Sequence, residues 1–368
     1  MWYRSVIISL VVVAAFTTNF AFARSAAIQQ LCVNCHTMHN SQKGDPMATA
    51  TGFAQGGLLK DSCYGCHSDS QNNSSGSVPF VLKTTAPAPV YNDIGTESPS
   101  NEFLAGGNFY WVSVESKDLM GHNVNGIASQ AGRTAPGGTE YFDGSRPLTC
   151  AGQNGCHGDS SILNETISMS QTHHSDVPVP TDGSPIQVIN AYRFLEGIAG
   201  IEDPDRELTA SPSNHNQYKG VARNADNDPD TTSMSHFCAR CHGDFHNDNG
   251  SADVNIAGIA GAAGFSSPWI RHPVDYSMAA AAALPGSEFA DYGGTGVNDY
   301  NIATPLASSN LATGVVQTVY QVAGDAIITC VSCHRAHGSP FDYSMRWNYK
   351  AWPGAGYNGC GDCHTLKN

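Results

Sequence analysis

The sequence predicts a largely irregular chain with short helices and a few short strands, in place of layered secondary structure around one hydrophobic core. Periodic segments are short, so long helices and long strands are not expected. Glycine and proline are frequent, at 38 and 19 of 368 residues, while only 9% of residues are aromatic. A cysteine–histidine unit recurs from residue 32 to residue 364, which indicates that one kind of site organises the whole length.

All twelve cysteines fall into six pairs, and a histidine follows the second cysteine of every pair. Five pairs have the spacing C-x-x-C-H, the attachment signature of c-type haem, in which two thiols bond the porphyrin and the next residue offers an imidazole to the iron. The sequence therefore predicts a multihaem cytochrome c organised around six covalently bound haem c groups. The attachment residues are Cys32, Cys35, Cys63, Cys66, Cys150, Cys156, Cys238, Cys241, Cys330, Cys333, Cys360 and Cys363, and the proximal iron ligands are His36, His67, His157, His242, His334 and His364.

A disulfide framework and zinc knuckles are the rival uses of paired cysteines. Neither explains why a histidine follows every pair directly. We therefore interpret the chain as an electron carrier or conductor and not as an enzyme.

The third motif departs from the usual spacing, because Ala-Gly-Gln-Asn-Gly separates Cys150 from Cys156. Gly152 and Gly155 would let this segment fold back tightly, so we expect the extra residues to bulge. The alternative is a free or disulfide-linked cysteine pair, with His157 in another role.

The first 23 residues have the features of a signal peptide. Arg4 supplies the positive charge, residues 5–20 are mostly apolar, and Ala21-Phe22-Ala23 matches an A-x-A cleavage site. A retained N-terminal anchor is the alternative. We expect residues 24–368 to form a single exported hexahaem domain, which agrees with the attachment of haem c outside the cytoplasm.

The chain is acidic, with 18 Lys plus Arg against 32 Asp plus Glu and a formal net charge of −14. Nucleic-acid binding needs a basic surface, so the composition argues against that class of partner. The acidity otherwise bears on solubility and on electrostatic steering.

Local patterns predict a small number of short elements. Each C-x-x-C-H segment is expected on a single helical turn, which places both sulfurs along one haem edge. Helices are predicted over Ser25–Met38, Asn190–Ile201 and Ser277–Leu284, the last capped by Asp275, and strands over Val78–Leu82, Phe109–Val114 and Val315–Val322.

Each haem iron also takes a second axial ligand. Nine histidines remain outside the motifs and six are needed for bis-histidine ligation throughout, while methionine is an alternative for a minority of the haems. One of His173 and His174 is expected to ligate, and His215 and His236 are the weakest choices. The distal candidates are His39, His122, His173, His174, His246, His272 and His337.

The spacing of three candidates carries more information than their number. His39 and His337 each follow a motif histidine by three residues, and His246 follows one by four. On a helix such residues share a face, so none of them can reach the opposite side of its own haem. A ligand at these positions must bind a different haem. The sequence therefore predicts haems in close contact along a continuous chain.

Several phrases of this sequence are distinctive: Cys32-Val-Asn-Cys-His-Thr-Met-His39, Leu104-Ala-Gly-Gly-Asn-Phe-Tyr-Trp111, Gly121-His-Asn-Val124, Leu148-Thr-Cys-Ala-Gly with Gly155-Cys-His-Gly158, Tyr192-Arg-Phe-Leu-Glu-Gly-Ile, and Phe237 to His246. They resemble phrases of the hexahaem OmcS-type outer-surface cytochromes of metal-reducing bacteria, a filament-forming family. The resemblance implies bis-histidine haems in alternating parallel and T-shaped pairs. It also implies head-to-tail polymers in which His39 binds a haem of the neighbouring subunit.

Three functions remain open at this point. The favoured one is extracellular electron transfer by a secreted or cell-surface homopolymer, exported through the periplasm. It would take electrons from outer-membrane donor cytochromes and pass them to extracellular acceptors such as metal oxides or electrodes. A monomeric periplasmic or surface shuttle is the first alternative. A multihaem reductase of a small molecule is the second, and it would need an open iron position.

Overall fold

The computed structural model of this chain describes a subset of its residues. All structural statements below concern residues 41–42, 45–46, 62–68, 79–87, 104–115, 118–129, 132–136, 140–169, 172, 188, 191–203, 206–207, 215–222, 230–243, 274–283, 285–286, 301–311, 326–351 and 357–364.

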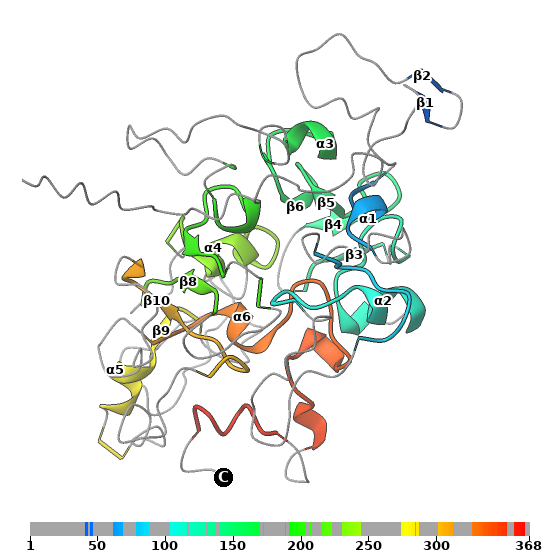
Figure 1. The fold of residues 1–368 in the computed structure, drawn as a ribbon. Helices are drawn as coiled ribbons and strands as arrows, with labels where there is room; N and C mark the ends of the chain where they lie inside the picture. The colour runs from blue at the N-terminus through cyan, green and yellow to red at the C-terminus, as the bar shows by residue number, and fades with distance from the viewer. Residues whose placement is uncertain are drawn as a thin grey trace, which may run out of the picture.

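The fold is mostly irregular, with short helices and strands, as the composition predicts (Figure 1). The α-helices are α1 (Cys63–Cys66), α2 (Tyr110–Glu115), α3 (Glu165–Ser168), α4 (Met234–Ala239), α5 (Met278–Ala282) and α6 (Cys330–Cys333). The 3₁₀ turns are η4 (Asp118–Met120), η6 (Tyr192–Phe194), η9 (Asp342–Ser344) and η10 (Tyr349–Ala351). The strands are β1 (Ser41–Gln42), β2 (Asp45–Pro46), β3 (Arg133–Thr134), β4 (Tyr141–Phe142), β5 (Thr149–Ala151), β6 (Gly155–His157), β7 (Gly200–Ile201), β8 (Gln217–Lys219), β9 (Tyr276–Ser277), β10 (Ala307–Ser308) and β11 (Ile327–Ile328).

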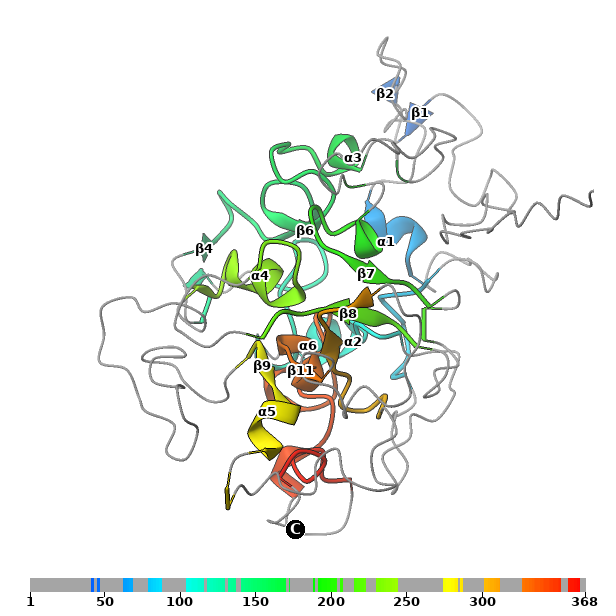
Figure 2. The same cartoon turned by 90° about the vertical axis from the view of Figure 1, so that its left-hand side faces the viewer.

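A small mixed sheet gathers segments that are far apart in the sequence. Its strand order is β7-β8-β10-β11-β9, with β8 and β10 parallel and the other neighbours antiparallel. β11 leads through a single residue, Thr329, into α6. Figures 1 and 2 both show α6 near the middle of the molecule, and α4 packs against it. The sheet therefore holds the fifth motif against the fourth.

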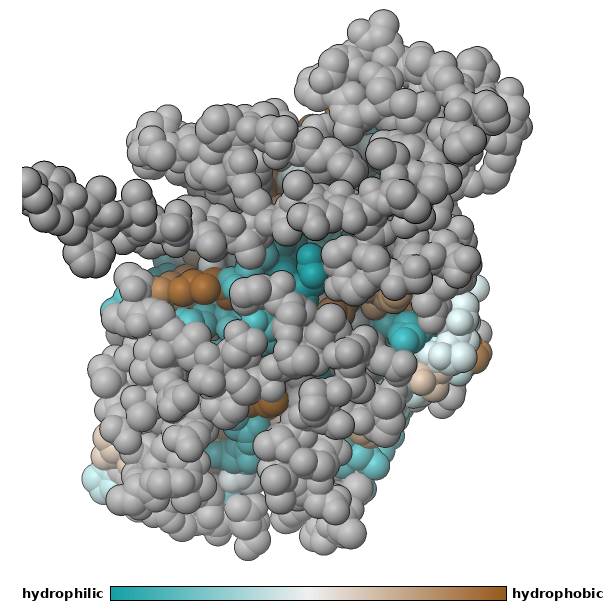
Figure 3. Space-filling model, viewed as in Figure 1, coloured by the Kyte–Doolittle hydropathy of each residue, from teal (hydrophilic) through white to brown (hydrophobic). Residues whose placement is uncertain are grey.

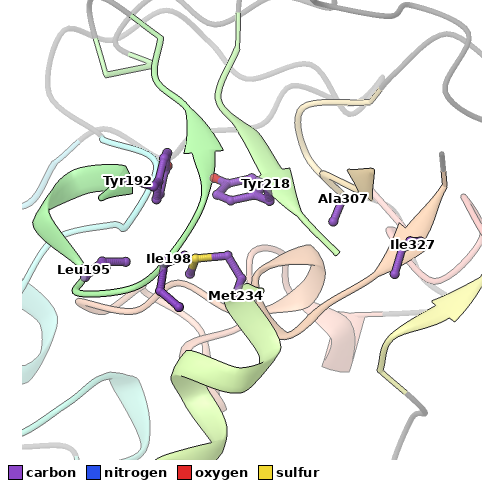
Figure 4. Packing of buried hydrophobic residues seen from close by; sticks show 7 residues of the cluster. All are labelled: Tyr192, Leu195, Ile198, Tyr218, Met234, Ala307 and Ile327. Atoms are coloured by element: carbon purple, nitrogen blue, oxygen red, sulfur yellow. The ribbon is translucent and has the colours of Figure 1, made fainter. Parts of the chain in front are cut away.

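Two hydrophobic clusters lie beside the motif cysteines. The larger one contains Tyr192, Leu195, Ile198, Tyr218, Met234, Ala307 and Ile327 (Figure 4). Cys156, Phe237 and Val331, which belong to or adjoin the third, fourth and fifth motifs, pack against this cluster. The smaller cluster contains Met278, Ile302, Leu306 and Ala326, and Cys363 of the sixth motif packs against it. The apolar side chains thus bring four motifs into one body.

Two predicted elements need correction. The predicted strand over 109–114 is absent, and Tyr110–Glu115 form helix α2. The Asn108 side chain accepts the Tyr110 N–H (2.9 Å) at the start of this helix. Helix α5 lies within the predicted 277–284 segment, but its start is set by Ser277, whose Oγ accepts the Ala280 N–H at 3.4 Å. Asp275 is buried with φ +60° and is not the cap.

The other predicted elements have mixed outcomes. The 190–201 segment contains only the turn η6 and strand β7. In the 78–82 segment, Leu82 forms an isolated bridge with Ser68, and no longer strand is present among residues 79–82. The predicted helix at 25–38 and the predicted strand at 315–322 lie outside the described residues, as does the expected signal peptide.

Within the described residues, no helix has the length and apolar character that a membrane crossing requires. Figure 3 shows scattered hydrophilic areas with a few small hydrophobic patches where the described residues are visible on this face.

Candidate haem-binding centres

Four of the motifs share one local backbone geometry. In each, the N–H of the histidine donates to the carbonyl oxygen of the first cysteine, four residues earlier. This bond closes one helical turn, so both cysteines and the histidine project from adjacent positions. The bonds are His67 to Cys63 (2.9 Å), His242 to Cys238 (3.0 Å), His334 to Cys330 (3.0 Å) and His364 to Cys360 (2.9 Å).

The third motif is built on a tight parallel ribbon. β5 and β6 pair so that Ala151 lies opposite His157, and Gly152 turns the chain with φ +79°. The extra residues therefore bulge, as the sequence predicts. The carboxylate of Glu165 fixes the start of the ribbon, because its Oε2 accepts the N–H groups of Cys150 (3.0 Å) and Ala151 (3.3 Å).

The first cysteines of the second and third motifs lie side by side. The sulfurs of Cys63 and Cys150 and a carboxylate oxygen of Glu165 all lie within 4.8 Å of one another. A hydrogen bond from Cys150 lowers the pKa of Cys63, and the same bond raises the pKa of Cys150. Because the two sulfurs belong to different motifs, each can serve a different porphyrin, and those porphyrins would meet at this edge.

Sulfurs of other motifs are also close enough to influence one another. Burial, with a smaller effect from Cys241, raises the pKa of Cys156 to about 11. Burial, followed by Cys360, raises the pKa of Cys333 to about 12. The third motif therefore lies within electrostatic range of the fourth, and the fifth within electrostatic range of the sixth.

Backbone carbonyls orient four of the proximal imidazoles through Nδ1. A histidine that donates Nδ1–H to a carbonyl presents Nε2 as its metal-binding atom, which is the usual arrangement around protein metal sites. The Nδ1–oxygen distances are 2.9 Å from His67 to Pro79, 2.9 Å from His157 to Arg193, 2.6 Å from His242 to Pro136 and 2.7 Å from His334 to Tyr343.

Two motif histidines face a second histidine at the separation that one iron requires. The ring centroids of His242 and His122 are 6.2 Å apart, and those of His157 and His337 are 6.3 Å apart. An imidazole nitrogen binds a metal at about 2.0 Å and its ring centroid lies about 1.1 Å further out, so two imidazoles on opposite sides of one iron have centroids about 6 Å apart. Both pairs therefore fit bis-histidine ligation of a haem.

The pairing of His157 with His337 bears on the spacing argument. His337 follows His334 by three residues, yet its ring faces the histidine of the third motif and not that of the fifth. The sequence predicts this kind of crossing, in which the second histidine serves another haem.

Glycines make room for these two distal candidates. A Cβ atom on Gly106 would lie 3.1 Å from the His337 ring, and one on Gly121 would lie 2.4 Å from the His337 carbonyl oxygen. The His337 N–H donates to the Gly106 carbonyl at 2.7 Å. The His122 Nδ1 lies 2.6 Å from the Ala336 carbonyl oxygen. The segments around residues 106, 121 and 337 thus lie so close together that residues 106 and 121 have no room for a side chain.

Burial favours the neutral form of three of these imidazoles, those of His337, His242 and His157, and the neutral form is the one that binds a metal. It lowers the pKa of His337 to about 3, with a smaller effect from His157. It lowers the pKa of His242 to about 4, with a smaller effect from His122. The pKa of His157 is also lowered, and burial is again the main cause.

Several predicted site residues lie outside the described residues. The two histidines that the sequence ranks as the weakest ligands, His215 and His236, are in the described part of the chain and have different surroundings. His215 is buried and its Nδ1 lies 2.8 Å from the Asn216 carbonyl oxygen, the same arrangement as in the proximal histidines, whereas His236 lies on α4. The residues outside are Cys32, Cys35, His36, His39, His173, His174, His246 and His272, together with the side chain of Cys66.

Sequence reasoning missed the groups that hold the ligands in place. The carbonyl acceptors can belong to any residue type, so no sequence pattern identifies them. Glu165 and the buried Arg335, whose guanidinium donates to the carbonyls of Leu104 (3.1 Å) and Ala105 (2.9 Å), were equally unmarked.

Several known proteins are similar to this chain. The family model for the doubled CXXCH motif matches residues 321–368, which contain the fifth and sixth motifs. C-type cytochrome OmcS of Geobacter sulfurreducens is 26% identical over 396 aligned residues, covering 93% of this chain and 84% of that protein. A solved outer membrane cytochrome S filament from the same organism matches with a TM-score of 0.42 and 20% identity, over 94% of this chain and 100% of the other. A second solved structure, of OmcS nanowires from Geobacter sulfurreducens, matches with a TM-score of 0.38 and 21% identity, over 92% of this chain and 90% of the other.

The irregular fold and the repeated cysteine–histidine geometry define a multihaem c-type cytochrome. This chain is OmcS-like, with a similarity that extends over nearly all of its length.

Proposed function

We propose that this chain is a hexahaem conductor that carries electrons along closely packed bis-histidine haems and polymerises head to tail outside the cell. The observation that carries the proposal is the pair of facing imidazoles, His242 with His122 and His157 with His337, at 6.2 and 6.3 Å. Each supplies two nitrogen ligands to one iron, which leaves no position for a substrate. Iron that is ligated on both sides exchanges electrons and does not activate small molecules.

The cofactor would be six haem c groups, held by the twelve cysteines and the six motif histidines. When bound, each haem supplies a one-electron centre. The chain's own residues set how close those centres lie. We assign His122 as the distal ligand of the fourth haem and His337 as that of the third. His39, one of His173 and His174, His246 and His272 stay as the candidates for the others, and the buried His215 joins them.

The order of contacts supports a continuous path. Cys63 of the second motif adjoins Cys150 of the third, and Cys156 of the third lies within electrostatic range of Cys241 of the fourth. Helix α4 of the fourth motif packs against α6 of the fifth, and Cys333 lies within electrostatic range of Cys360 of the sixth. In this proposal the second to sixth haems are each near the next haem in sequence. Electron tunnelling falls off exponentially with distance, so such contacts favour rapid hopping.

Polymerisation is proposed from the resemblance to OmcS-type cytochromes. His39 cannot reach the far side of the haem that His36 binds, and in this proposal it ligates a haem of the next subunit. A contact between unlike surfaces that does not close into a ring generates an open filament. Residues 24–368 would be the exported unit. Its donors would be outer-membrane cytochromes and its acceptors extracellular metal oxides or electrodes.

Three measurements test the proposal on the natural protein made in a host that attaches haem c. Mass spectrometry of the mature chain should give six porphyrins. Electron paramagnetic resonance should show low-spin ferric iron at every centre, and a high-spin centre that binds nitrite or hydroxylamine would instead favour a reductase. Electron microscopy should show filaments, whereas separate particles that exchange electrons would favour a monomeric shuttle.

A further inference from the structure

Two of the carbonyls that hold proximal histidines belong to residues in an unusual backbone conformation. Arg193, which accepts from His157, has φ +49°, and Tyr343, which accepts from His334, has φ +60°. Residues with a side chain rarely adopt the left-handed region, and bulky residues there mark strain or function. The acceptors for the second and fourth motifs, by contrast, are prolines, whose φ is fixed by the ring.

In both cases the following residue is left-handed as well and makes a second matching bond. Phe194 (φ +59°) accepts the N–H of Gly158 at 2.9 Å. Ser344 (φ +53°) accepts the N–H of Arg335 at 2.8 Å. Each left-handed pair therefore binds the ring of a motif histidine with its first carbonyl and the next backbone N–H with its second.

Left-handed pairs alone are not sufficient to identify this arrangement. A third pair, Arg206-Glu207, has φ angles of 65° and 65°, and its Arg206 carbonyl accepts the N–H of Ala105 at 3.4 Å. What recurs at His157 and His334 is the combination of a ring bond and a neighbouring backbone bond. Two unrelated sequences, Arg-Phe and Tyr-Ser, adopt it at equivalent places in two motifs.

We propose that Arg193-Phe194 and Tyr343-Ser344 are positioning residues that lock the imidazoles of His157 and His334 and set the reduction potentials of the third and fifth haems. This inference rests on the proposed function, because it assumes that these histidines ligate iron. Donation of Nδ1–H to a fixed carbonyl makes the imidazole a stronger electron donor, which stabilises ferric iron and lowers the potential. Loss of the bond would raise it.

Tyr343 offers the cleanest test, because its side chain is 56% exposed while its carbonyl makes the ring bond. Tyr343→Val and Tyr343→Asn both remove the aromatic ring, but valine disfavours the left-handed region and asparagine tolerates it. In Tyr343→Val, one of the six reduction steps in spectroelectrochemistry should move to higher potential, and the low-spin g values of one centre should change. Tyr343→Asn should behave as the unmodified protein does.

The controls separate this inference from the proposed function. Tyr141→Val removes a similarly exposed tyrosine from β4 and should leave all six steps in place. All variants should retain six porphyrins by mass. Absence of porphyrin from the unmodified protein would overturn the proposed function. Six porphyrins with the same potentials in Tyr343→Val and Tyr343→Asn, whether both shifted or both unchanged, would overturn only the inference.

A second pair of variants covers the case in which Tyr343→Val does not fold. Ser344→Thr adds one methyl group and disfavours φ +53°, and Ser344→Gly permits it freely. A shift of one reduction step in Ser344→Thr that is absent in Ser344→Gly supports the positioning role of Tyr343-Ser344. Equal potentials in the two variants overturn it.

Discussion

The Nδ1 atom of His122 lies 2.6 Å from the carbonyl oxygen of Ala336, although 214 positions separate the two residues. Ala336 lies between His334, a motif histidine of the fifth unit, and His337, which faces the third. One four-residue segment therefore contacts groups assigned to the third, fourth and fifth haems. The ring of His122 is therefore oriented by Ala336, which lies in a segment that is not assigned to the fourth haem.

Removal of His122 should convert one iron to high spin. In His122→Ala the fourth haem keeps His242 and both thioether bonds, so the protein should still carry six porphyrins by mass. One sixth of the ferric iron should then give a high-spin signal in electron paramagnetic resonance. His236→Ala, on helix α4, is the matched control and should leave all centres low-spin. Six low-spin centres in His122→Ala would contradict the assignment.

A single methyl group at Gly121 should disturb both distal ligands. A Cβ atom there would lie 2.4 Å from the His337 carbonyl oxygen and 2.6 Å from a methyl group of Val112, which is buried. We expect Gly121→Ala to reduce the free energy of unfolding by about 1–3 kcal/mol, as overpacking does. Thermal unfolding measures this effect. Gly144→Ala, where nothing lies within 4 Å of the added atom, should change it little.

The long third motif predicts a specific spectral change. In Cys150→Ser one thioether bond to the third haem is lost while Cys156 and His157 remain. The porphyrin then retains one vinyl group, so the alkaline pyridine spectrum of one haem in six should shift to longer wavelength, with the porphyrin count unchanged. If the pair were instead free or joined as a disulfide, the spectrum would not move.

The partly buried carboxylate of Asp362 should lower the potential of the sixth haem. Asp362 lies between Cys360 and Cys363 and accepts hydrogen bonds from Thr304 (2.6 Å) and Asn301 (2.8 Å). A negative charge near iron stabilises the ferric state, so Asp362→Asn should raise one potential by on the order of tens of millivolts. Spectroelectrochemistry would detect this, and the exposed Asp118→Asn serves as control. An unchanged titration would show that the charge does not act on the haem.

His39 carries the prediction for assembly. His39→Ala should abolish filaments in electron microscopy, because the distal ligand donated to the neighbouring subunit is lost, and all six porphyrins should remain attached. Intact filaments with altered redox coupling inside the subunit would place His39 on a haem of its own chain.

The sequence was sufficient to predict the irregular fold, because few segments carry a period long enough for a helix or strand. It also predicted the helical turns of C-x-x-C-H and the bulge between Cys150 and Cys156, since both follow from bonding geometry over a few residues. The strand predicted for residues 109–114 was wrong because β-branched and aromatic composition depends strongly on context, and here the Asn108 side chain accepts the Tyr110 N–H where helix α2 begins.

The supporting groups could not be predicted for a different reason. Any residue offers a carbonyl, and the choice of Arg193 or Tyr343 depends on where distant segments meet. The pairing of His337 with His157 depends likewise on contacts across 180 positions, and spacing alone gave only that His337 must leave its own haem. Motifs of a few residues can be predicted from sequence, whereas contacts between residues far apart in the chain cannot.

His337 follows His157 by 180 positions, and under the proposed function this separation bears on how the molecule matures. A chain exported from its N-terminus delivers Cys156 and His157 long before His337 arrives. During that interval the third iron would have one imidazole and an exposed face, so premature release or truncation should yield a pigment that reacts with small molecules. Under the proposed function, the third centre would therefore lose its reactivity toward small molecules only after residues 334–337 have folded against it.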